Sequence, residues 1–116
     1  MASYDFPRSA RLVRSSQFGR VYRAGLRCKQ FPLYVRALPK EEGESRLGLS
    51  VGRKTGKAVV RNRWKRAIRE AFRLNRHRLN QPHDLVVAVD WDATEDDIGR
   101  VEEAFLEVVE YLNARD

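Results

Sequence analysis

An amphipathic pattern fills residues 60–73, which read Val60-Arg61-Asn62-Arg63-Trp64-Lys65-Arg66-Ala67-Ile68-Arg69-Glu70-Ala71-Phe72-Arg73. At 100° per residue, a helix places the apolar residues of this stretch on one side and most cationic residues on the other. The apolar side comprises Val60, Trp64, Ala67, Ile68, Ala71 and Phe72, and the polar side comprises Arg61, Asn62, Lys65, Arg66, Arg69, Arg73 and Arg76. Like charges four residues apart destabilise an isolated helix by roughly 0.2–0.5 kcal/mol per pair. The pattern therefore predicts a helix that packs on a core and binds a polyanion.

Positive charge is concentrated in the first two thirds of the chain. Residues 1–78 hold 21 Lys and Arg against 5 Asp and Glu, whereas residues 79–116 hold 2 against 11, which gives the 116-residue chain its net charge of +7. Arg outnumbers Lys, and the planar guanidinium can donate two parallel hydrogen bonds to a phosphate. The basic part is the expected binding surface, and nucleic acid is a better candidate partner than membrane lipid.

Length and composition favour one compact domain over two. No apolar segment approaches the roughly 20 residues needed to span a bilayer, and the first residues lack the apolar core of a signal peptide, so we expect a cytoplasmic protein. Cys28 is the only cysteine and can form no internal disulfide. With His77 and His83 as the only histidines, no zinc-ligand spacing is present, and we expect no bound metal.

The first quarter of the chain predicts an arm followed by a short helix. Residues 1–14 carry few large apolar side chains and are expected to form a basic, loosely ordered N-terminal arm, anchored at Leu12, ahead of a single domain over residues 15–116. A helix is predicted over residues 15–24, with Ser15 or Ser16 as its N-cap and Gly25 as its stop.

Alternating apolar residues predict two strands. Over residues 30–38 the two sides are Phe31, Leu33, Val35 and Ala37 against Pro32, Tyr34, Arg36 and Leu38; over residues 46–52 they are Leu47, Leu49 and Val51 against Gly48, Ser50 and Gly52. A polar turn separates the strands, so we expect them to pair as an antiparallel hairpin.

The rest of the chain predicts a long helix, an interior strand and a last helix. The long helix spans residues 58–77, with Thr55 as its cap. Residues 85–89 form a continuous apolar run, which is typical of a strand covered on both faces, and we expect it to pair in parallel with residues 46–52. Thr94 and the acids after it predict the start of a helix whose buried stripe is Ile98, Val101, Phe105, Val108, Val109 and Leu112.

The polar side of the two predicted strands carries little bulk. It presents Tyr34, Arg36, Gly48, Ser50 and Gly52 if the apolar side faces the helices. A base could stack on Tyr34 while a phosphate meets Arg36, as in proteins that bind single-stranded nucleic acid. Phe18 and Tyr22 lie one helical turn apart and could wall this trough, although core packing explains Phe18 equally well.

Other aromatic and ionisable residues have structural explanations. We expect Trp64 and Phe72 in the core, His77 and His83 exposed, and Trp91 packed over the end of the sheet. Six acids could hold Mg²⁺ for a nuclease, namely Asp84, Asp90, Asp92, Glu95, Asp96 and Asp97. They lie in the acidic third of the chain, and helix capping explains the last three more economically. No nucleophile elbow, phosphate loop or paired-carboxylate spacing is present, so these patterns predict a small RNA- or DNA-binding α/β domain.

Two connected motifs resemble the protein subunit of bacterial ribonuclease P. They read Leu47-Gly48-Leu49-Ser50-Val51-Gly52-Arg53-Lys54 and Gly56-Lys57-Ala58-Val59-Val60-Arg61-Asn62-Arg63-Trp64-Lys65-Arg66, and the likeness extends over nearly the whole chain. The resemblance implies a single α+β domain, ordered α-β-β-β-α-β-α around a four-stranded mixed sheet (ribosomal protein S5 domain 2-like). It also implies a left-handed β-α-β crossover, where the general rule predicts a right-handed one.

The resemblance further implies an accessory role in an endoribonuclease that removes the 5′ leader from precursor tRNA. The RNA subunit would carry Mg²⁺ and the cleavage chemistry; the protein, with no catalytic residue, metal or cofactor of its own and monomeric when alone, would help substrate and Mg²⁺ to bind. The ribonuclease P RNA would be contacted by Arg53, Lys54, Lys57, Arg61, Asn62, Arg63, Lys65, Arg66 and Arg69. Phe18, Tyr22 and Tyr34 would hold the leader, and the trough adds Arg36 and Ser50 to that set.

Two residues depart from the family pattern, and two other functions stay open. Asp90 stands where basic residues are common, which puts leader or RNA contacts at that corner in doubt, and Tyr22 stands where phenylalanine is frequent. One alternative is a ribosomal or chaperone-like RNA-binding module, which fits the composition equally well. The other is a self-sufficient Mg²⁺-dependent nuclease that uses Asp90 or Asp92. The order of the motifs favours ribonuclease P over both.

Overall fold

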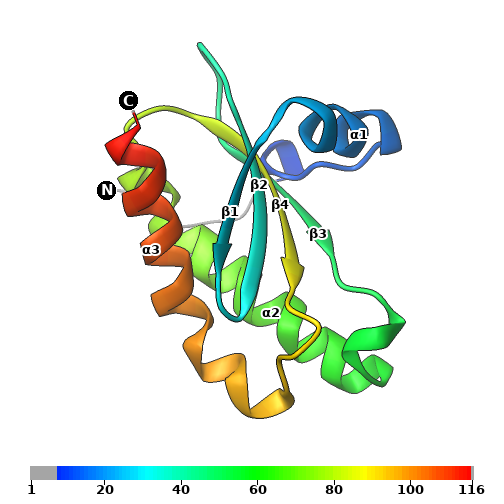
Figure 1. Cartoon of the computed structure of the whole chain (residues 1–116). Helices are drawn as coiled ribbons and strands as arrows, with labels where there is room; N and C mark the ends of the chain where they lie inside the picture. Colours follow the sequence, from blue (N-terminus) through cyan, green and yellow to red (C-terminus); the bar gives the residue numbers. More distant parts are fainter. Residues whose placement is uncertain (1–7, 116) are drawn as a thin grey trace.

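The computed structural model of the chain describes residues 8–115, which form a four-stranded sheet with α2 and α3 on one face and α1 on the other (Figure 1). The helices and strands are α1 (Ser15–Ala24), β1 (Leu26–Gln30), β2 (Leu33–Pro39), β3 (Arg46–Ser50), α2 (Ala58–Asn75), β4 (His83–Val89) and α3 (Val101–Ala114). Short 3₁₀ helices are η1 (Arg8–Ala10), η2 (Arg53–Thr55), η3 (Arg76–Arg78) and η4 (Glu95–Arg100). Within residues 8–115, no helix combines the length and apolar character needed to cross a membrane.

The sheet has the order β1-β2-β4-β3. β3 pairs with β4 in parallel, which confirms that prediction, while β2 pairs antiparallel with both β1 and β4. The predicted hairpin between residues 30–38 and 46–52 is wrong, because β4 lies between these two strands. The apolar β4 is buried along nearly its whole length, and a central place between β2 and β3 provides that burial.

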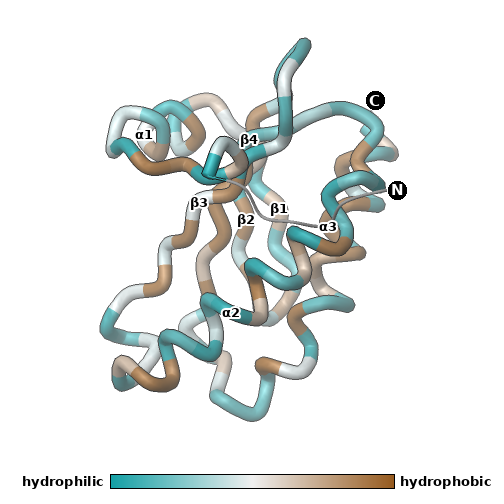
Figure 2. The backbone as a smooth tube through the Cα atoms, turned by 180° about the vertical axis from the view of Figure 1, so that it is seen from behind, coloured by the Kyte–Doolittle hydropathy of each residue, from teal (hydrophilic) through white to brown (hydrophobic). Residues whose placement is uncertain are grey.

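α2 connects β3 to β4 by a left-handed crossover. In Figure 1 both strands run downward, β4 lies to the left of β3, and α2 passes behind the sheet; Figure 2 shows α2 from its own side, in front of the strands. The tube of α2 alternates between teal and brown in that view, as expected of an amphipathic helix (Figure 2). The family resemblance implied this handedness, against the general preference.

The main core lies between the sheet and the pair α2 and α3. Trp64 and Phe72 are fully buried there, as predicted, and the ring of Phe72 meets that of Phe105 edge to face at 6.2 Å. The predicted stripe of the last helix is also confirmed: Val101, Phe105, Val108, Val109 and Leu112 are buried, and Ile98 packs against them. A smaller cluster under α1 joins Leu12, Val21 and Val86 on the opposite face.

The helix ends differ from the predictions in detail. α1 has the predicted bounds, and Gly25 ends it by donating its N–H to the carbonyl of Val21 at 2.8 Å. Its N-cap residue is Arg14 instead of Ser15 or Ser16, because the Gln17 side chain reaches back and accepts from the Arg14 N–H at 2.9 Å. Lys57, not Thr55, is the N-cap residue of α2, since Thr55 belongs to η2. Thr94 is the N-cap residue of η4, which precedes α3, whereas the N-cap residue of α3 itself is Arg100.

The predicted N-terminal arm is described only from residue 8. In its second half Ala10 is buried, and Leu12 is buried and donates its N–H to the carbonyl of Leu47 at 2.9 Å. Residues 8–14 thus lie along β3 and lead into α1. Residues 1–7 of the arm lie outside the described part of the chain.

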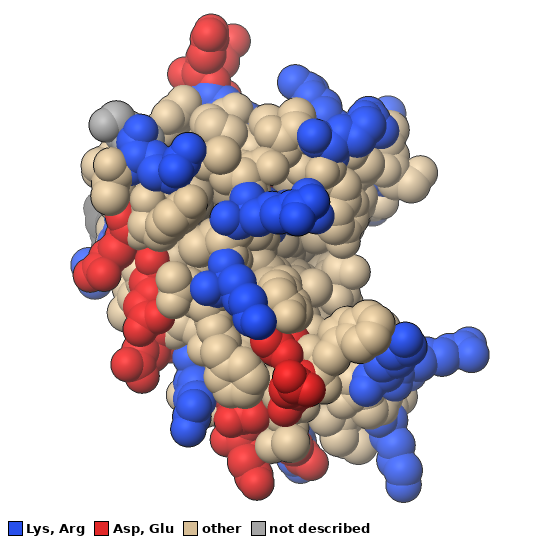
Figure 3. All heavy atoms as spheres, in the orientation of Figure 1, with Lys and Arg blue, Asp and Glu red and all other residues tan. Residues whose placement is uncertain are grey.

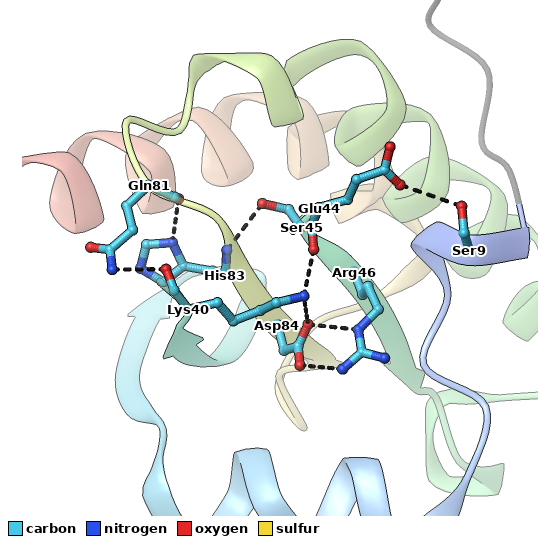
Figure 4. Close-up of polar contacts among 8 residues, drawn as sticks. All are labelled: Ser9, Lys40, Glu44, Ser45, Arg46, Gln81, His83 and Asp84. Carbon is cyan, nitrogen blue, oxygen red and sulfur yellow. Dashed lines mark hydrogen bonds and ion pairs between the residues drawn. The ribbon is translucent and has the colours of Figure 1, made fainter. Parts of the chain in front are cut away.

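A polar cluster aligns the starts of β3 and β4 (Figure 4). The buried carboxylate of Asp84 accepts hydrogen bonds from Arg46 Nε at 2.9 Å and Nη2 at 2.7 Å, and from Lys40 Nζ at 3.2 Å. Burial alone would raise the pKa of Asp84, but the hydrogen bonds from Arg46 and Lys40 lower that pKa below its usual value. His83, which precedes Asp84 in β4, is buried, and its backbone N–H donates to Ser45 Oγ. The predicted exposure of His83 is therefore wrong.

Candidate nucleic-acid interface

Two rows of residues cross the outer face of the sheet, opposite α2 and α3. The strand registers align Lys29, Tyr34, Ala88 and Ser50 in the first row, and Arg27, Arg36, Val86 and Gly48 in the second. α1 covers part of the second row, since Val86 is buried beneath it. The first row stays open and forms the floor of a groove, which we call the sheet groove.

One wall of the sheet groove comes from α1. Arg36 Nη1 donates to the carbonyl oxygen of Tyr22 at 2.9 Å, and its guanidinium lies 5.7 Å from the centroid of the Tyr22 ring. Tyr22 and Tyr34 line the same depression, of about 380 Å³, above Ala88. The structure therefore brings together three residues of the predicted trough: Tyr22, Tyr34 and Arg36.

The opposite wall comes from η2 and the loop after β4. A second depression, of about 390 Å³, is lined by Ser50, Arg53, Lys54 and Trp91, and it shares Ala88 with the first. The two depressions are therefore parts of one groove. Figure 3 shows the hollow on the right of the molecule, with Lys and Arg side chains above and below it.

Phe18 lies apart from Tyr34. Its ring covers Gly48 and packs beside the small core cluster of Leu12, Val21 and Val86. Phe18 also lines a depression of about 300 Å³ at the β3 edge, to which Lys65 and Arg69 of α2 contribute. Phe18 thus packs against the small core cluster, which agrees with one of its two interpretations, and it also borders the depression that contains Lys65 and Arg69.

The cationic side of α2 faces away from the core. Asn62, Arg63, Arg66 and Arg69 are exposed on it, Arg61 and Lys65 are half-buried, and Arg53, Lys54 and Lys57 are exposed just before it. Arg63 forms an ion pair with Glu95 of η4. Glu70, the only acid of α2, pairs with Arg73, and the hydrogen bond from Arg73 lowers the pKa of Glu70. Acidic side chains instead gather along the left and lower edges in Figure 3, over α3 and the segment before it.

The sequence patterns missed three residues of the sheet groove: Arg27, Lys29 and Trp91. Lys29 Nζ lies 5.0 Å from the centroid of the Tyr34 ring and 3.7 Å from the carboxylate of Asp90. Its pKa is raised, first by Tyr34 and then by Asp90. In β1 the apolar Leu26 and Cys28 alternate with the cationic Arg27 and Lys29. This alternation is the sequence signal that identifies the strand and its outward residues.

The acids considered for a metal site are dispersed. Among residues 8–115, no three His, Cys, Asp or Glu side chains gather as a metal site would require. Asp84 is paired with Arg46 and Lys40, and Thr94 and Asp97 cap η4. The buried carboxylate of Asp90 accepts the backbone N–H of Asp92 at 2.8 Å and faces Lys29.

Comparisons with known proteins give one consistent result. The family model described as Ribonuclease P matches residues 6–113. The ribonuclease P protein component of Dictyoglomus turgidum is 41% identical over 92 residues, which cover 77% of this chain and 75% of that protein. That of Desulforapulum autotrophicum is 40% identical over 86 residues, 73% of each chain.

Solved structures agree with the sequence relatives. The RNase P protein of Staphylococcus aureus superposes with a TM-score of 0.75 at 30% identity, over 91% of this chain and 100% of that chain. The RNase P protein of Thermotoga maritima gives a TM-score of 0.76 at 28% identity, over 87% of this chain and 96% of that chain. The structural similarity thus extends over most of the chain.

Proposed function

Because the chain belongs to the ribonuclease P protein family, we propose that it is the protein subunit of a ribonuclease P, the endoribonuclease that removes the 5′ leader from precursor tRNA. The reaction hydrolyses one phosphodiester bond and leaves a 5′-phosphate on the mature tRNA and a 3′-hydroxyl on the leader. The RNA subunit carries out this chemistry, and the protein binds RNA.

The sheet groove is the observation that carries this proposal. Its floor offers the exposed ring of Tyr34 beside Ala88 and Ser50, so a nucleobase can stack without meeting bulky side chains. Lys29 stands next to that ring, and Arg36, beside Tyr22, lines the same depression, so both can meet the adjacent phosphates. An aromatic platform lined by cations binds a single strand with little dependence on base identity. The leader of precursor tRNA is such a strand.

The cationic side of α2 supports contact with the catalytic RNA. Nine residues are proposed for this surface: Arg53, Lys54, Lys57, Arg61, Asn62, Arg63, Lys65, Arg66 and Arg69. Phosphates bound there would relieve the repulsion among like charges along the helix. Arg63 takes part by exchanging its pairing with Glu95 for a phosphate, since both side chains are largely exposed.

The leader-binding set then has two parts. Tyr22, Tyr34, Arg36 and Ser50 border the sheet groove itself. Phe18 borders the depression next to Lys65 and Arg69, where a strand leaving the groove over β3 would reach α2. Phe18 therefore serves at the passage between the leader and the catalytic RNA.

Mg²⁺ is proposed to bind to the RNA and not to this chain. Cations in the groove and on α2 lower the electrostatic repulsion between leader and RNA phosphates, which favours the assembled site that holds Mg²⁺.

We expect a monomer outside the holoenzyme, which light scattering of the purified protein would test. A cytoplasmic location accords with processing of newly made tRNA and with a lone, buried Cys28.

The deciding experiment measures cleavage of a precursor tRNA at low Mg²⁺ by a bacterial ribonuclease P RNA, with and without this protein. The expected result is stimulation by the protein and no cleavage by the protein alone. Tight RNA binding without stimulation would instead favour a ribosomal or chaperone-like module. Cleavage by the protein alone, abolished by Asp92→Asn, would favour a self-sufficient nuclease.

A further inference from the structure

Trp91 is held in water at the edge of the sheet groove. With 79% of its surface accessible, it is the most exposed of the large hydrophobic side chains among residues 8–115. The sequence predicts that Trp91 packs over the end of the sheet, which would bury its apolar surface and stabilise the fold, but the structure leaves it exposed. The exposure of Trp91 therefore calls for an explanation outside the folding of the chain.

The turn that carries Trp91 is tightly fixed. The backbone N–H of Asp90 donates to the carbonyl of Pro32 at 2.8 Å, and the N–H of Ala93 donates to the carbonyl of Asp90 at 3.1 Å. The Asp90 carboxylate accepts from the N–H of Asp92 at 2.8 Å, which is the bond of an Asx turn. Trp91 is thus presented outward by an ordered turn, and Asp90, which departs from the family pattern, helps to build that turn.

Trp91 and Lys54 form a pair across the groove wall. Lys54 Nζ, from η2, lies 4.1 Å from the centroid of the indole ring. Both residues line the same depression as Ser50 and Ala88, which belong to the groove floor. The pair faces the α1 wall, where Arg36 stands in the same relation to Tyr22 at 5.7 Å. Each wall of the groove therefore carries one aromatic ring with one cation.

We propose that Trp91 and Lys54 form a second base-binding position for the leader, on the wall of the sheet groove opposite Tyr22. A base of the single strand stacks on the indole face that Lys54 leaves open, and the Lys54 ammonium meets the neighbouring phosphate. The assignment rests on the proposed function, because it takes the leader as the occupant of the groove. It also moves Lys54 from the surface for the catalytic RNA to the junction between that surface and the leader.

An aromatic ring with an adjacent cation suits a nucleotide of a single strand. A π-face accepts any base, and the adjacent cation neutralises one phosphate, so the pair adds affinity without strong sequence preference. Two acids flank Trp91 in the sequence. Asp90 is buried and faces Lys29, and Asp92 is exposed but does not line the depression that Trp91 and Lys54 share. The depression itself therefore stays open to the leader.

The chain contains a spectroscopic reporter for this position. Its two tryptophans are Trp64, which is 1% exposed, and Trp91. A base that stacks on Trp91 quenches its fluorescence, whereas Trp64 in the core is shielded from RNA. The measurement titrates the reconstituted holoenzyme with precursor tRNA and, separately, with mature tRNA. We expect quenching by the precursor only, and none for Trp91→Phe, which keeps an aromatic ring without the indole signal.

Affinity provides the second readout. Trp91→Ala should weaken precursor tRNA binding by roughly 5- to 150-fold, the equivalent of about 1–3 kcal/mol for one stacked base, and leave mature tRNA binding unchanged. Trp91→Phe should keep most of the affinity. Tyr111→Ala is the matched control, since this exposed aromatic residue lies on α3, on the other side of the molecule.

Three outcomes would overturn the inference. The first is unchanged Trp91 fluorescence on addition of precursor tRNA, while Tyr34→Ala still weakens precursor tRNA binding. That result would leave the proposed function standing. The second is quenching on assembly with the catalytic RNA alone, which would place Trp91 at that interface. The third is equal loss of precursor and mature tRNA affinity in Trp91→Ala. If instead the holoenzyme shows no stimulated cleavage at all, the proposed function itself fails.

Discussion

The ring of Phe18 occupies the space that a side chain at Gly48 would need. A Cβ at Gly48 would stand 2.7 Å from Cε2 and Cζ of Phe18 and 3.1 Å from Cβ of Leu12. A glycine in β3 therefore allows α1 to lie directly on the sheet. That placement forms the α1 wall of the sheet groove.

Gly48→Ala should therefore destabilise the domain. The added methyl must push Phe18 and α1 outward, and overpacking of this kind typically costs about 1–3 kcal/mol. Urea unfolding measures the change. Gly52→Ala is the control, because a Cβ there meets nothing within 4 Å and the residue has an extended backbone. Equal stability of Gly48→Ala and wild type would show that α1 is not held against β3 in this way.

Tyr34→Ala should lower the affinity of the holoenzyme for precursor tRNA and leave its affinity for mature tRNA unchanged. The lost stacking platform corresponds to about 1–3 kcal/mol, and only the precursor carries a leader. Equilibrium binding of both RNAs to wild-type and variant holoenzymes gives the comparison, with Tyr111→Ala as the aromatic control on α3. A similar loss for both RNAs would remove Tyr34 from the leader-binding set.

The pairing of Asp84 with Arg46 makes stability depend on pH. The folded-state pKa of Asp84 is lowered from the ordinary value of 3.8, so its contribution is fully present well above pH 3.8 and is lost as the pH falls through the lower folded value. Asp84→Asn should cost up to about 3 kcal/mol near neutral pH, at the low end for buried ion pairs because Arg46 keeps partial exposure. The difference from wild type should shrink as the pH falls below 3.8, where the unfolded chain is protonated first, and should be smallest below the lower folded-state pKa of Asp84.

Urea unfolding of wild type and Asp84→Asn across that pH range tests this expectation. Glu110→Gln, an exposed acid on α3, is the control and should unfold like wild type at each pH. A gap between Asp84→Asn and wild type that stays constant with pH would mean that the Asp84 charge does not stabilise the β3–β4 contact.

Sequence patterns predicted facing directions better than strand partners. The side-chain period of a strand is two whichever strand lies beside it, so Tyr34, Arg36 and Ser50 were correctly placed on one face. Alternation carries no information about partners, and β2 and β3 were wrongly joined as a hairpin. Their separation depends on the burial of β4 between them, a property of the whole sheet.

The errors at single residues have a similar origin. In the sequence, Phe31 continues the alternation of apolar residues in β2, but in the structure it lies in the turn before the strand and is exposed. His83 and Trp91 were each assigned the opposite exposure, because the register of β4 buries the first and the Asp90 turn presents the second. α1, α2 and α3 needed no such context, since each contains its own apolar stripe.

Arg66→Ala should reduce the salt dependence of binding to the catalytic RNA. Arg66 is exposed near the middle of the cationic side of α2, and one lost phosphate contact lowers the slope of log K against log salt by roughly 0.7–0.9. Binding measured over a series of salt concentrations gives that slope. Arg100→Ala is the matched control, because Arg100 lies at the end of η4 beside Asp97, within the acidic part of the chain, and should leave the slope unchanged. An unchanged slope for Arg66→Ala would take this residue off the RNA interface, whereas equal changes for both variants would show that binding responds to net charge and not to the α2 surface.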